Sequence, residues 1–299
     1  GADSYQKIID YFKPELLLGM SASPERGDNF DVFKLFDHNI ACEIRLQQAL
    51  ENDLLCPFHY FGITDIDIDG EIGDISSFSQ LTSDKRVEHI LERAEYYGYS
   101  GDRVKGLIFC STKKEASELS KKFNETGRYS TIMLCGENSQ EERESAVERL
   151  VTTNHPHKLD YIFTVDIFNE GVDIPEINQV IMLRPTESPI IFVQQLGRGL
   201  RKADGKEFVI VIDFIGNYQN NYMIPIALSG DRTGNKDNIR RSLMEGNNLI
   251  QGASTIYFDE VSRKKIYESI DAANLNRAQI LKKEYQSLKC KLGRIPHLK

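Results

Sequence analysis

Two polar stretches joined by an apolar run decide the fold of this chain. The first reads Asn169-Glu-Gly-Val-Asp173-Ile-Pro175, and the second reads Gln194-Gln-Leu-Gly197-Arg198-Gly-Leu-Arg201. The run between them, residues 179–183, has the length and the β-branched residues of a buried strand. Arg198 and Arg201 are three positions apart, so on a helix they would share one face and point at one anionic target. Their planar, permanently charged guanidinium groups match phosphate oxygens.

Each stretch taken alone also has a simpler interpretation. An Arg-x-x-Arg pair at a helix end is most often a solvated basic surface, and Asp173 ahead of a proline is most often an Asx-turn. Their order and their separation by one predicted strand favour a functional interpretation. Together they resemble motifs V and VI of superfamily-2 helicases and translocases.

A third match lies upstream. The run Ser21-Ala-Ser23-Pro-Glu-Arg26 resembles motif III of the same family with serine in place of both threonines. In the family this motif couples nucleotide binding to nucleic-acid binding through its hydroxyl groups, and serine keeps the hydroxyl. In the family this motif closes the first RecA-like domain. The sequence contains neither Gly-x-x-x-x-Gly-Lys-Ser/Thr nor an Asp-Glu-x-His or Asp-Glu-Ala-Asp box. We therefore expect a truncated chain that holds half of an ATPase site and is inactive alone.

The resemblance implies a nucleotide site. Catalytic roles fall to Gln194, Arg198 and Arg201, and nucleotide binding falls to Gly171, Asp173, Gly197, Arg198 and Arg201. The two arginines would act as arginine fingers on the β- and γ-phosphates. Asp173 would bond the ribose, and Gly197 would let the backbone approach closely. ATP and Mg²⁺ would be bound mainly by the missing first RecA-like domain, and no metal ligand is expected in this chain.

The resemblance also implies a nucleic-acid track. Thr164 matches a position whose hydroxyl contacts the nucleic-acid backbone. Ser111 and Thr112 follow an apolar strand in a step that resembles motif IV, and we expect them to contact nucleic acid in the same way. Ser21 and Ser23 would couple nucleotide binding to nucleic-acid binding.

Strand and helix patterns alternate around these motifs. We expect strands at residues 104–110, 129–135, 159–165, 179–183 and 207–213. Helices are expected at residues 86–97 after a Ser83 cap, from Ser111 or Thr112 to residue 123, and from a Ser139 cap. This order predicts an α/β fold with a parallel sheet, which the resemblance specifies as RecA-like, that is, P-loop NTPase-like.

Four parts follow along the chain. Residues 1–40 are expected to be a remnant of the first RecA-like domain, 41–82 an interdomain stretch, 83–215 the second RecA-like domain, and 216–299 a helical C-terminal extension. We expect a buried strand at residues 16–20 and an aromatic strand at 57–63. The acidic run from Asp65 is interpreted as an edge strand with a solvated face rather than a calcium loop. The last helix, residues 274–291, is interpreted as packed and amphipathic, with a basic nucleic-acid surface as the alternative.

Composition sets further bounds. The chain has 299 residues, 40% of them hydrophobic and 27% charged, and a formal net charge of −8, so any nucleic-acid surface must be local. The five scattered cysteines have no metal-ligand spacing, which indicates a reducing, cytoplasmic setting. His155 and His157 flank a proline and are interpreted as a turn. No apolar run approaches the roughly 20 residues of a membrane span.

The expected function is that of an ATP-dependent helicase or translocase. The motifs are most similar to those of superfamily-2 DEAD/DEAH-box helicases of the type I/III restriction-enzyme-like kind. The expected partners are nucleic acid, with double-stranded DNA favoured, and the protein's own N-terminal RecA-like domain; no membrane is involved. The alternatives are a non-catalytic RecA-like nucleic-acid-binding module, a restriction-enzyme translocase subunit, and half of a nucleotide-sugar transferase.

Overall fold

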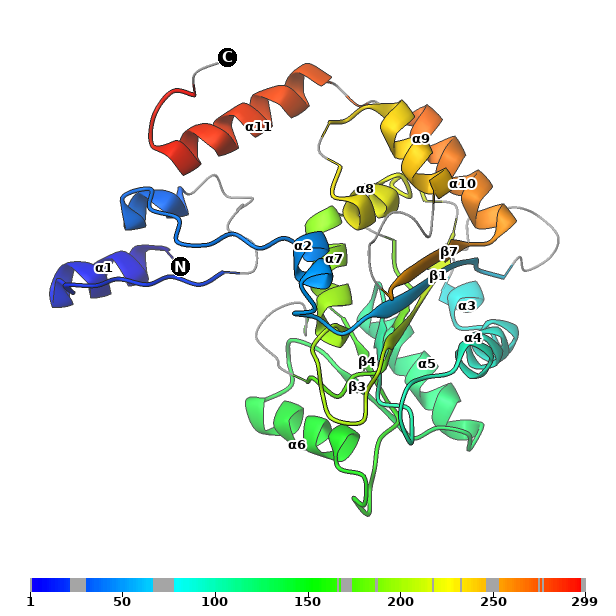
Figure 1. Ribbon diagram of the computed structural model, residues 1–299. Helices are drawn as coiled ribbons and strands as arrows, with labels where there is room; N and C mark the ends of the chain where they lie inside the picture. Colours follow the sequence, from blue (N-terminus) through cyan, green and yellow to red (C-terminus); the bar gives the residue numbers. More distant parts are fainter. Residues whose placement is uncertain are drawn as a thin grey trace. The chain divides into compact units, whose positions relative to one another are not determined.

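The structure is a computed structural model (Figure 1). The structure describes residues 2–21, 31–66, 78–165, 167, 174–185, 188–216, 218–231, 233–245, 253–273, 275 and 277–296. The chain forms two compact units. The terminal unit comprises Gly1–Ile44 and Leu275–Lys299, and the sheet unit comprises Arg45–Asn274.

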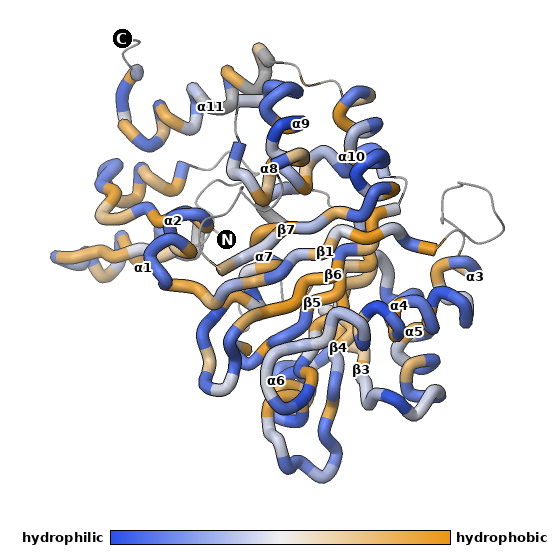
Figure 2. The backbone as a smooth tube through the Cα atoms, turned by 45° about the vertical axis from the view of Figure 1, so that its right-hand side comes forward, coloured by the Kyte–Doolittle hydropathy of each residue, from blue (hydrophilic) through white to orange (hydrophobic). Residues whose placement is uncertain are grey.

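A parallel sheet forms the centre of the sheet unit. Its order is β3-β4-β2-β5-β6-β1-β7, and every neighbouring pair is parallel. The strands are β1 (Phe58–Thr64), β2 (Gly106–Phe109), β3 (Thr131–Leu134), β4 (Tyr161–Thr164), β5 (Gln179–Met182), β6 (Val209–Ile215) and β7 (Thr255–Phe258). The central strands β2, β4, β5 and β6 are buried at every position, and Figure 2 shows β5 and β6 as predominantly hydrophobic. The predicted α/β fold with a parallel sheet is confirmed.

Helices cover both faces of this sheet because parallel strands need crossover connections and those connections are right-handed. On one face lie α4 (Asp84–Tyr97) and α5 (Lys113–Glu125); on the other lie α6 (Gln140–Val151) and α7 (Pro189–Gly199). Phe123 of α5 packs edge-on against Phe163 of β4, with ring centroids 5.0 Å apart. On the opposite face, Phe192 of α7 packs against Tyr60 of β1 at 5.9 Å.

The remaining helices of the sheet unit are α2 (Leu46–Glu51), α3 (Phe78–Leu81), α8 (Met223–Ser229), α9 (Lys236–Glu245) and α10 (Glu260–Ala272). The predicted caps are in place. The hydroxyls of Ser83, Thr112 and Ser139 accept hydrogen bonds from the third backbone N–H of α4, α5 and α6, and Ser139 forms a full capping box with Glu142.

The sheet extends beyond residues 83–215 on both sides. Strand β1, expected as an aromatic strand in the interdomain stretch, lies between β6 and β7. Strand β7 falls within the part expected to be helical and was not predicted. The interpretation of Asp65 as part of a solvated face is wrong: Asp65 is 3% exposed, because it pairs with a buried arginine. Residues 67–70 of the same acidic run lie outside the described residues.

The terminal unit contains α1 (Ala2–Phe12), the 3₁₀ helix η1 (Val32–Phe36) and α11 (Arg277–Leu292). The prediction of a buried strand at residues 16–20 is wrong here. This segment has no strand partner among the described residues, and Leu16, Leu18 and Met20 are exposed. The helix predicted at residues 274–291 exists, but its apolar stripe is not packed within this unit, since Leu281 is 61% exposed.

Candidate functional site

The motif VI residues lie at the end of α7. This helix begins after the carboxyl end of β5 and runs back toward the amino ends of the strands. A Cβ added to Gly199 would lie 2.8 Å from Val209, the first residue of β6, and 3.3 Å from Val180 in β5. Only glycine permits that approach of the helix to the sheet. The last turn of α7 therefore rests on the amino-terminal edge of the sheet.

Arg198 and Arg201 do not share one helical face as expected, because α7 ends between them. Arg198 is half-buried within the helix, whereas Arg201 is exposed beyond its end. The turn tightens there: the Leu200 N–H donates to Gly197 O at 3.2 Å. A Cβ on Gly197 would meet no described atom within 4 Å, so its side of the helix is open. Gln194 is half-buried, and its neighbour Gln195 is buried.

Lys206 joins the two motifs. Its ammonium donates to Gly199 O at the end of α7 and to Ile177 O, both at 3.1 Å, and also to Pro175 O. Pro175 is the last residue of motif V. Burial lowers the pKa of Lys206 to about 8, and the nearby Cys56 and Glu176 oppose that change. The sequence analysis did not identify Lys206, whose only local signal is its place in a polar turn between helix and strand.

The segment before β1 also holds this end of α7. The Cys56 N–H donates to Leu200 O at 2.7 Å, and the Lys202 ammonium pairs with Asp53 at 2.7 Å. Burial raises the pKa of the Cys56 thiol, while the charges of Lys206 and Lys202 lower it. The end of motif VI is thus fixed by side chains and backbone from three separate segments.

The predicted nucleic-acid contacts lie at the opposite edge of the sheet. Ser111 and Thr112 follow the carboxyl end of β2, and Thr164 ends the adjacent strand β4. Ser111 and Thr112 are exposed. Thr164 is fully buried, and its hydroxyl donates to Ile167 O at 3.1 Å. In this structure Thr164 therefore supports the loop after β4 rather than presenting its hydroxyl to solvent.

A buried ion cluster is hydrogen-bonded to the backbone of Ser111. Arg86 of α4 is fully buried and donates to Asp65 Oδ2 at 2.8 Å and to Glu115 Oε1 at 3.0 Å. The second oxygen of Glu115 accepts the Ser111 N–H at 3.0 Å. Burial disfavours the charge of Arg86, but the two carboxylates outweigh it and raise its pKa. The cluster therefore fixes the turn that carries Ser111, and the sequence analysis missed it.

Another buried acid, Asp213, lies in β6. The Tyr60 hydroxyl donates to Asp213 Oδ2 at 2.5 Å. Burial raises the pKa of Asp213 to about 7, and the bond from Tyr60 counteracts part of that rise. Tyr218, beyond the end of the strand, is also largely enclosed, and burial raises its pKa to about 12.

Some expected site residues are not placed. Gly171, Asp173 and Ser23 lie outside the described residues, so motif V is represented by its exit at Ile174 and Pro175. Ser21 is described and exposed. Nothing in the described part of the chain tests its coupling role.

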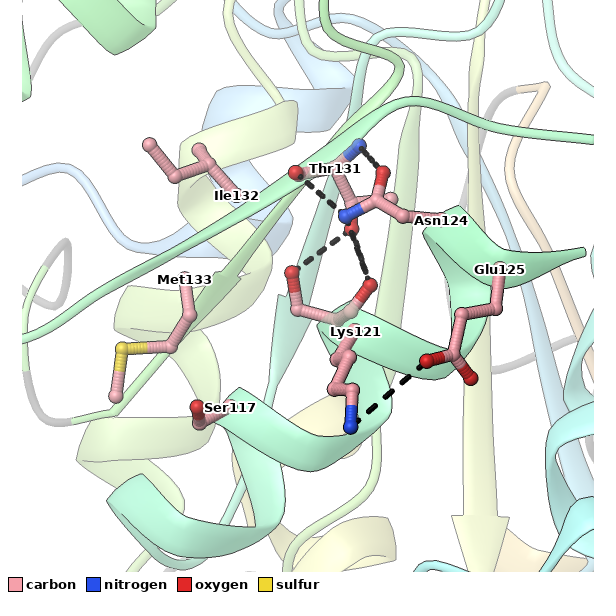
Figure 3. Close-up of a pocket in the computed structure, with 8 residues that line it drawn as sticks. Ser117, Lys121, Asn124, Glu125, Thr131, Ile132 and Met133 are labelled. Atoms are coloured by element: carbon pink, nitrogen blue, oxygen red, sulfur yellow. Dashed lines mark hydrogen bonds and ion pairs between the residues drawn. The ribbon is translucent and has the colours of Figure 1, made fainter. Parts of the chain in front are cut away.

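A shallow groove lies elsewhere, between α5 and the edge strand β3 (Figure 3). Its floor is closed by Asn124, whose amide exchanges two hydrogen bonds with the Thr131 backbone at 2.8 and 3.1 Å. None of the expected site residues lines it.

Among the described residues, no cluster of three or more His, Cys, Asp or Glu side chains has metal-binding geometry. No described helix combines the length and apolar character needed to span a membrane.

Comparison with known proteins agrees with this geometry. Residues 85–203 match the family model described as the helicase conserved C-terminal domain. The putative ATP-dependent helicase IRC3 of Saccharomyces cerevisiae is 26% identical over 231 residues, 72% of this chain and 32% of that protein. The endonuclease subunit of the Escherichia coli type I restriction enzyme EcoKI is 29% identical over 119 residues, 37% of this chain and 10% of that protein.

Among solved structures, a fragment of a putative HsdR subunit of a type I restriction enzyme from Vibrio vulnificus superposes with a TM-score of 0.54 at 22% identity. It covers 71% of this chain and 42% of that one. Residues 85–203 therefore match the helicase conserved C-terminal domain, and the sheet has the RecA-like fold. The curated relatives include ATP-dependent helicases and a restriction-enzyme subunit. Three curated relatives that align with more than 70% of this chain are matched over only 32%, 47% and 36% of their own length.

Proposed function

We propose that this chain is part of an ATP-dependent helicase or translocase that acts on double-stranded DNA, and that it supplies the arginine fingers. The observation that carries the proposal is the end of α7. Arg198 and Arg201 flank the helix end, next to the open side of Gly197 and to the exit of motif V. Phosphoryl transfer needs positioned positive charge more than covalent chemistry, and arginine forks supply it.

ATP and Mg²⁺ would be held mainly by a first RecA-like domain, to which residues 1–40 would belong. The exposed apolar side chains of Leu16, Leu18 and Met20 support this assignment, because a strand of that composition is normally buried in a sheet. Gln194 would position the γ-phosphate, and Gly171 and Asp173 would hold the ribose side of the nucleotide. Ser21 and Ser23 would couple the two domains.

The track would run along the opposite edge of the sheet. Exposed Ser111 and Thr112 would bond backbone phosphates, and Thr164 would contribute through the loop that it holds. ATP binding would close the interdomain cleft, and the grip on nucleic acid would differ between the open and closed states.

The arginine fingers are tested in the full-length protein. We expect Arg201→Ala to lower the kcat of nucleic-acid-stimulated ATP hydrolysis by about 10³-fold, because the charge that develops on the phosphates loses its partner. Arg128→Ala is the matched control, since Arg128 pairs with Glu88 and Glu95 on an exposed surface. A rate for Arg201→Ala within a few-fold of wild type would refute the assignment. Running duplex DNA, single-stranded DNA and RNA side by side identifies the track.

A second candidate is the motor subunit of a restriction enzyme, which moves along duplex DNA without separating its strands. It is supported by the match to the EcoKI endonuclease subunit. Displacement of a third strand from a DNA triplex, without release of single strands from a duplex, would favour this candidate over a helicase.

A further inference from the structure

We propose that Lys206 is a positioning residue that fastens the exit of motif V to the end of the motif VI helix and thereby places Arg198 and Arg201 for catalysis. This inference rests on the proposed function and adds a residue to the same site. Lys206 belongs to neither motif. Its ammonium nevertheless bonds one carbonyl of each and a third carbonyl between motif V and β5.

The geometry explains why a lysine suits this place. An ammonium has three N–H donors and no acceptor, and three carbonyl oxygens, those of Pro175, Ile177 and Gly199, surround it. The Gly199 carbonyl lies in the last turn of α7, where helix carbonyls lack partners within the helix and where a cation is favoured by the helix dipole. Lys206 thus donates to a carbonyl at the end of α7 that lacks a partner within the helix, and it links this helix end to residues 175–177.

The Lys206 ammonium with its three carbonyl acceptors, which we call the Lys206 clamp, lies close in sequence to both arginines. Gly199 follows Arg198 directly, and Leu200, held by the Cys56 N–H, precedes Arg201. A shift of the Gly199 carbonyl would therefore move both guanidinium groups. Because catalysis by charged groups is sensitive to displacements of about 1 Å, loosening the clamp would lower the rate without removing a group that touches the nucleotide.

The surroundings of the ammonium are mixed in charge. Besides the carbonyls, the groups near Lys206 are the Cys56 thiol, the Glu176 carboxylate and the Lys105 ammonium. With a pKa of about 8, the side chain is mostly protonated at pH 7 and keeps all three donors. Above pH 8 the side chain is mostly the neutral amine, which has only two N–H donors, so one of the three carbonyls loses its hydrogen bond.

The first test is amide hydrogen exchange in the 299-residue chain with Lys206→Met, which keeps the length of the side chain and removes its charge. We expect the amides of residues 176–178 and 197–200 to exchange about tenfold faster, and those of β2 and β4 to exchange at the wild-type rate. Lys105→Met is the matched control. Unchanged exchange at both segments would overturn the inference. If Lys206→Met does not fold, Lys206→Gln, which keeps two N–H donors, replaces it.

The second test is a double-mutant cycle on ATPase activity in the full-length protein. Lys206→Met should lower kcat about tenfold or more while the Kd for nucleic acid stays within about twofold. In an Arg198→Ala background the same change should lower kcat by a clearly smaller factor than in wild type, because part of the effect of Lys206 passes through Arg198. Fully additive losses would show that it does not. A wild-type protein without ATPase activity would refute the proposed function instead, and hydrogen exchange would still decide whether the clamp exists.

Discussion

Two cations of the sheet unit, the fully buried Arg86 and the partly buried Lys206, have different partners. Arg86 lies among carboxylates, those of Asp65 and Glu115, whereas Lys206 lies among backbone carbonyls. Burial disfavours both charges, yet the pKa of Arg86 is raised and that of Lys206 is lowered to about 8. Full negative charges compensate desolvation, and carbonyl dipoles do so only in part.

The difference indicates different tasks. A guanidinium between two carboxylates keeps its charge at every pH at which the protein is folded, so the Arg86 cluster is a permanent fixture behind the Ser111 turn. The charge of Lys206 is stabilised only by carbonyl dipoles, and with a pKa of about 8 the side chain loses its charge at a lower pH than Arg86 does. In the proposed motor, the track side of the sheet would therefore be more rigid than the side that carries the arginine fingers.

The largest effect is expected at Arg86. Arg86→Leu leaves two buried carboxylates without their cation and should lower the free energy of unfolding by about 3–5 kcal/mol. Urea denaturation followed by circular dichroism measures it. Arg128→Leu, which removes only exposed ion pairs, is the control and should change stability little. Equal losses in the two variants would mean that the cluster is solvated in solution.

Asp213 extends the comparison to a buried carboxyl that accepts a hydrogen bond from a hydroxyl, that of Tyr60. Its pKa of about 7 in the folded protein lies above that of the unfolded chain, so its stabilising contribution is present below pH 4 and is lost as pH rises through 7. Asp213→Asn keeps an acceptor for Tyr60 and removes the charge. At pH 8 the variant should be more stable than wild type by about 2–4 kcal/mol.

Denaturation curves for Asp213→Asn from pH 4 to pH 9 give the required profile, with the exposed Asp204→Asn as the matched control. The difference between the variant and wild type should grow with pH. A difference between the variant and wild type that stays flat from pH 5 to pH 8 would show that Asp213 is ionised in the fold and that other groups compensate its burial.

Local patterns account for what the sequence predicted correctly. The hydroxyl caps at Thr112 and Ser139 and the apolar runs that became β2, β4, β5 and β6 depend on residues close in sequence. Strand β7 has four residues, like β2, β4 and β5, but Tyr257 within it is half exposed, so it lacks the fully buried apolar run by which those strands were recognised.

Long-range partners account for what was missed. Arg86 reads as an ordinary charged residue of an amphipathic helix, and only its pairing with Asp65, 21 positions earlier, and Glu115, 29 positions later, makes burial possible. Arg143 of α6 likewise reads as a charged residue on a helix surface, but it is half-buried and donates to Gly136 O at 2.9 Å. The two expected arginine fingers were identified by motif, while the lysine that holds their helix end had no motif to reveal it.

The smallest effect is expected for the stability of the Lys206 clamp, and its sign differs from that at Asp213. The pKa of Lys206 is lower in the folded protein than the ordinary value of 10.5, so the unfolded chain binds more protons between pH 8 and pH 10.5. Over that interval wild type should therefore gain stability relative to Lys206→Met, by about 1–2 kcal/mol, since part of the side chain reaches solvent and is screened. The matched Lys105→Met should show a smaller slope, because burial also lowers the pKa of Lys105 but encloses it less. A flat difference for Lys206→Met would mean that the three carbonyls fully compensate the partial burial of Lys206, as the two carboxylates do for Arg86.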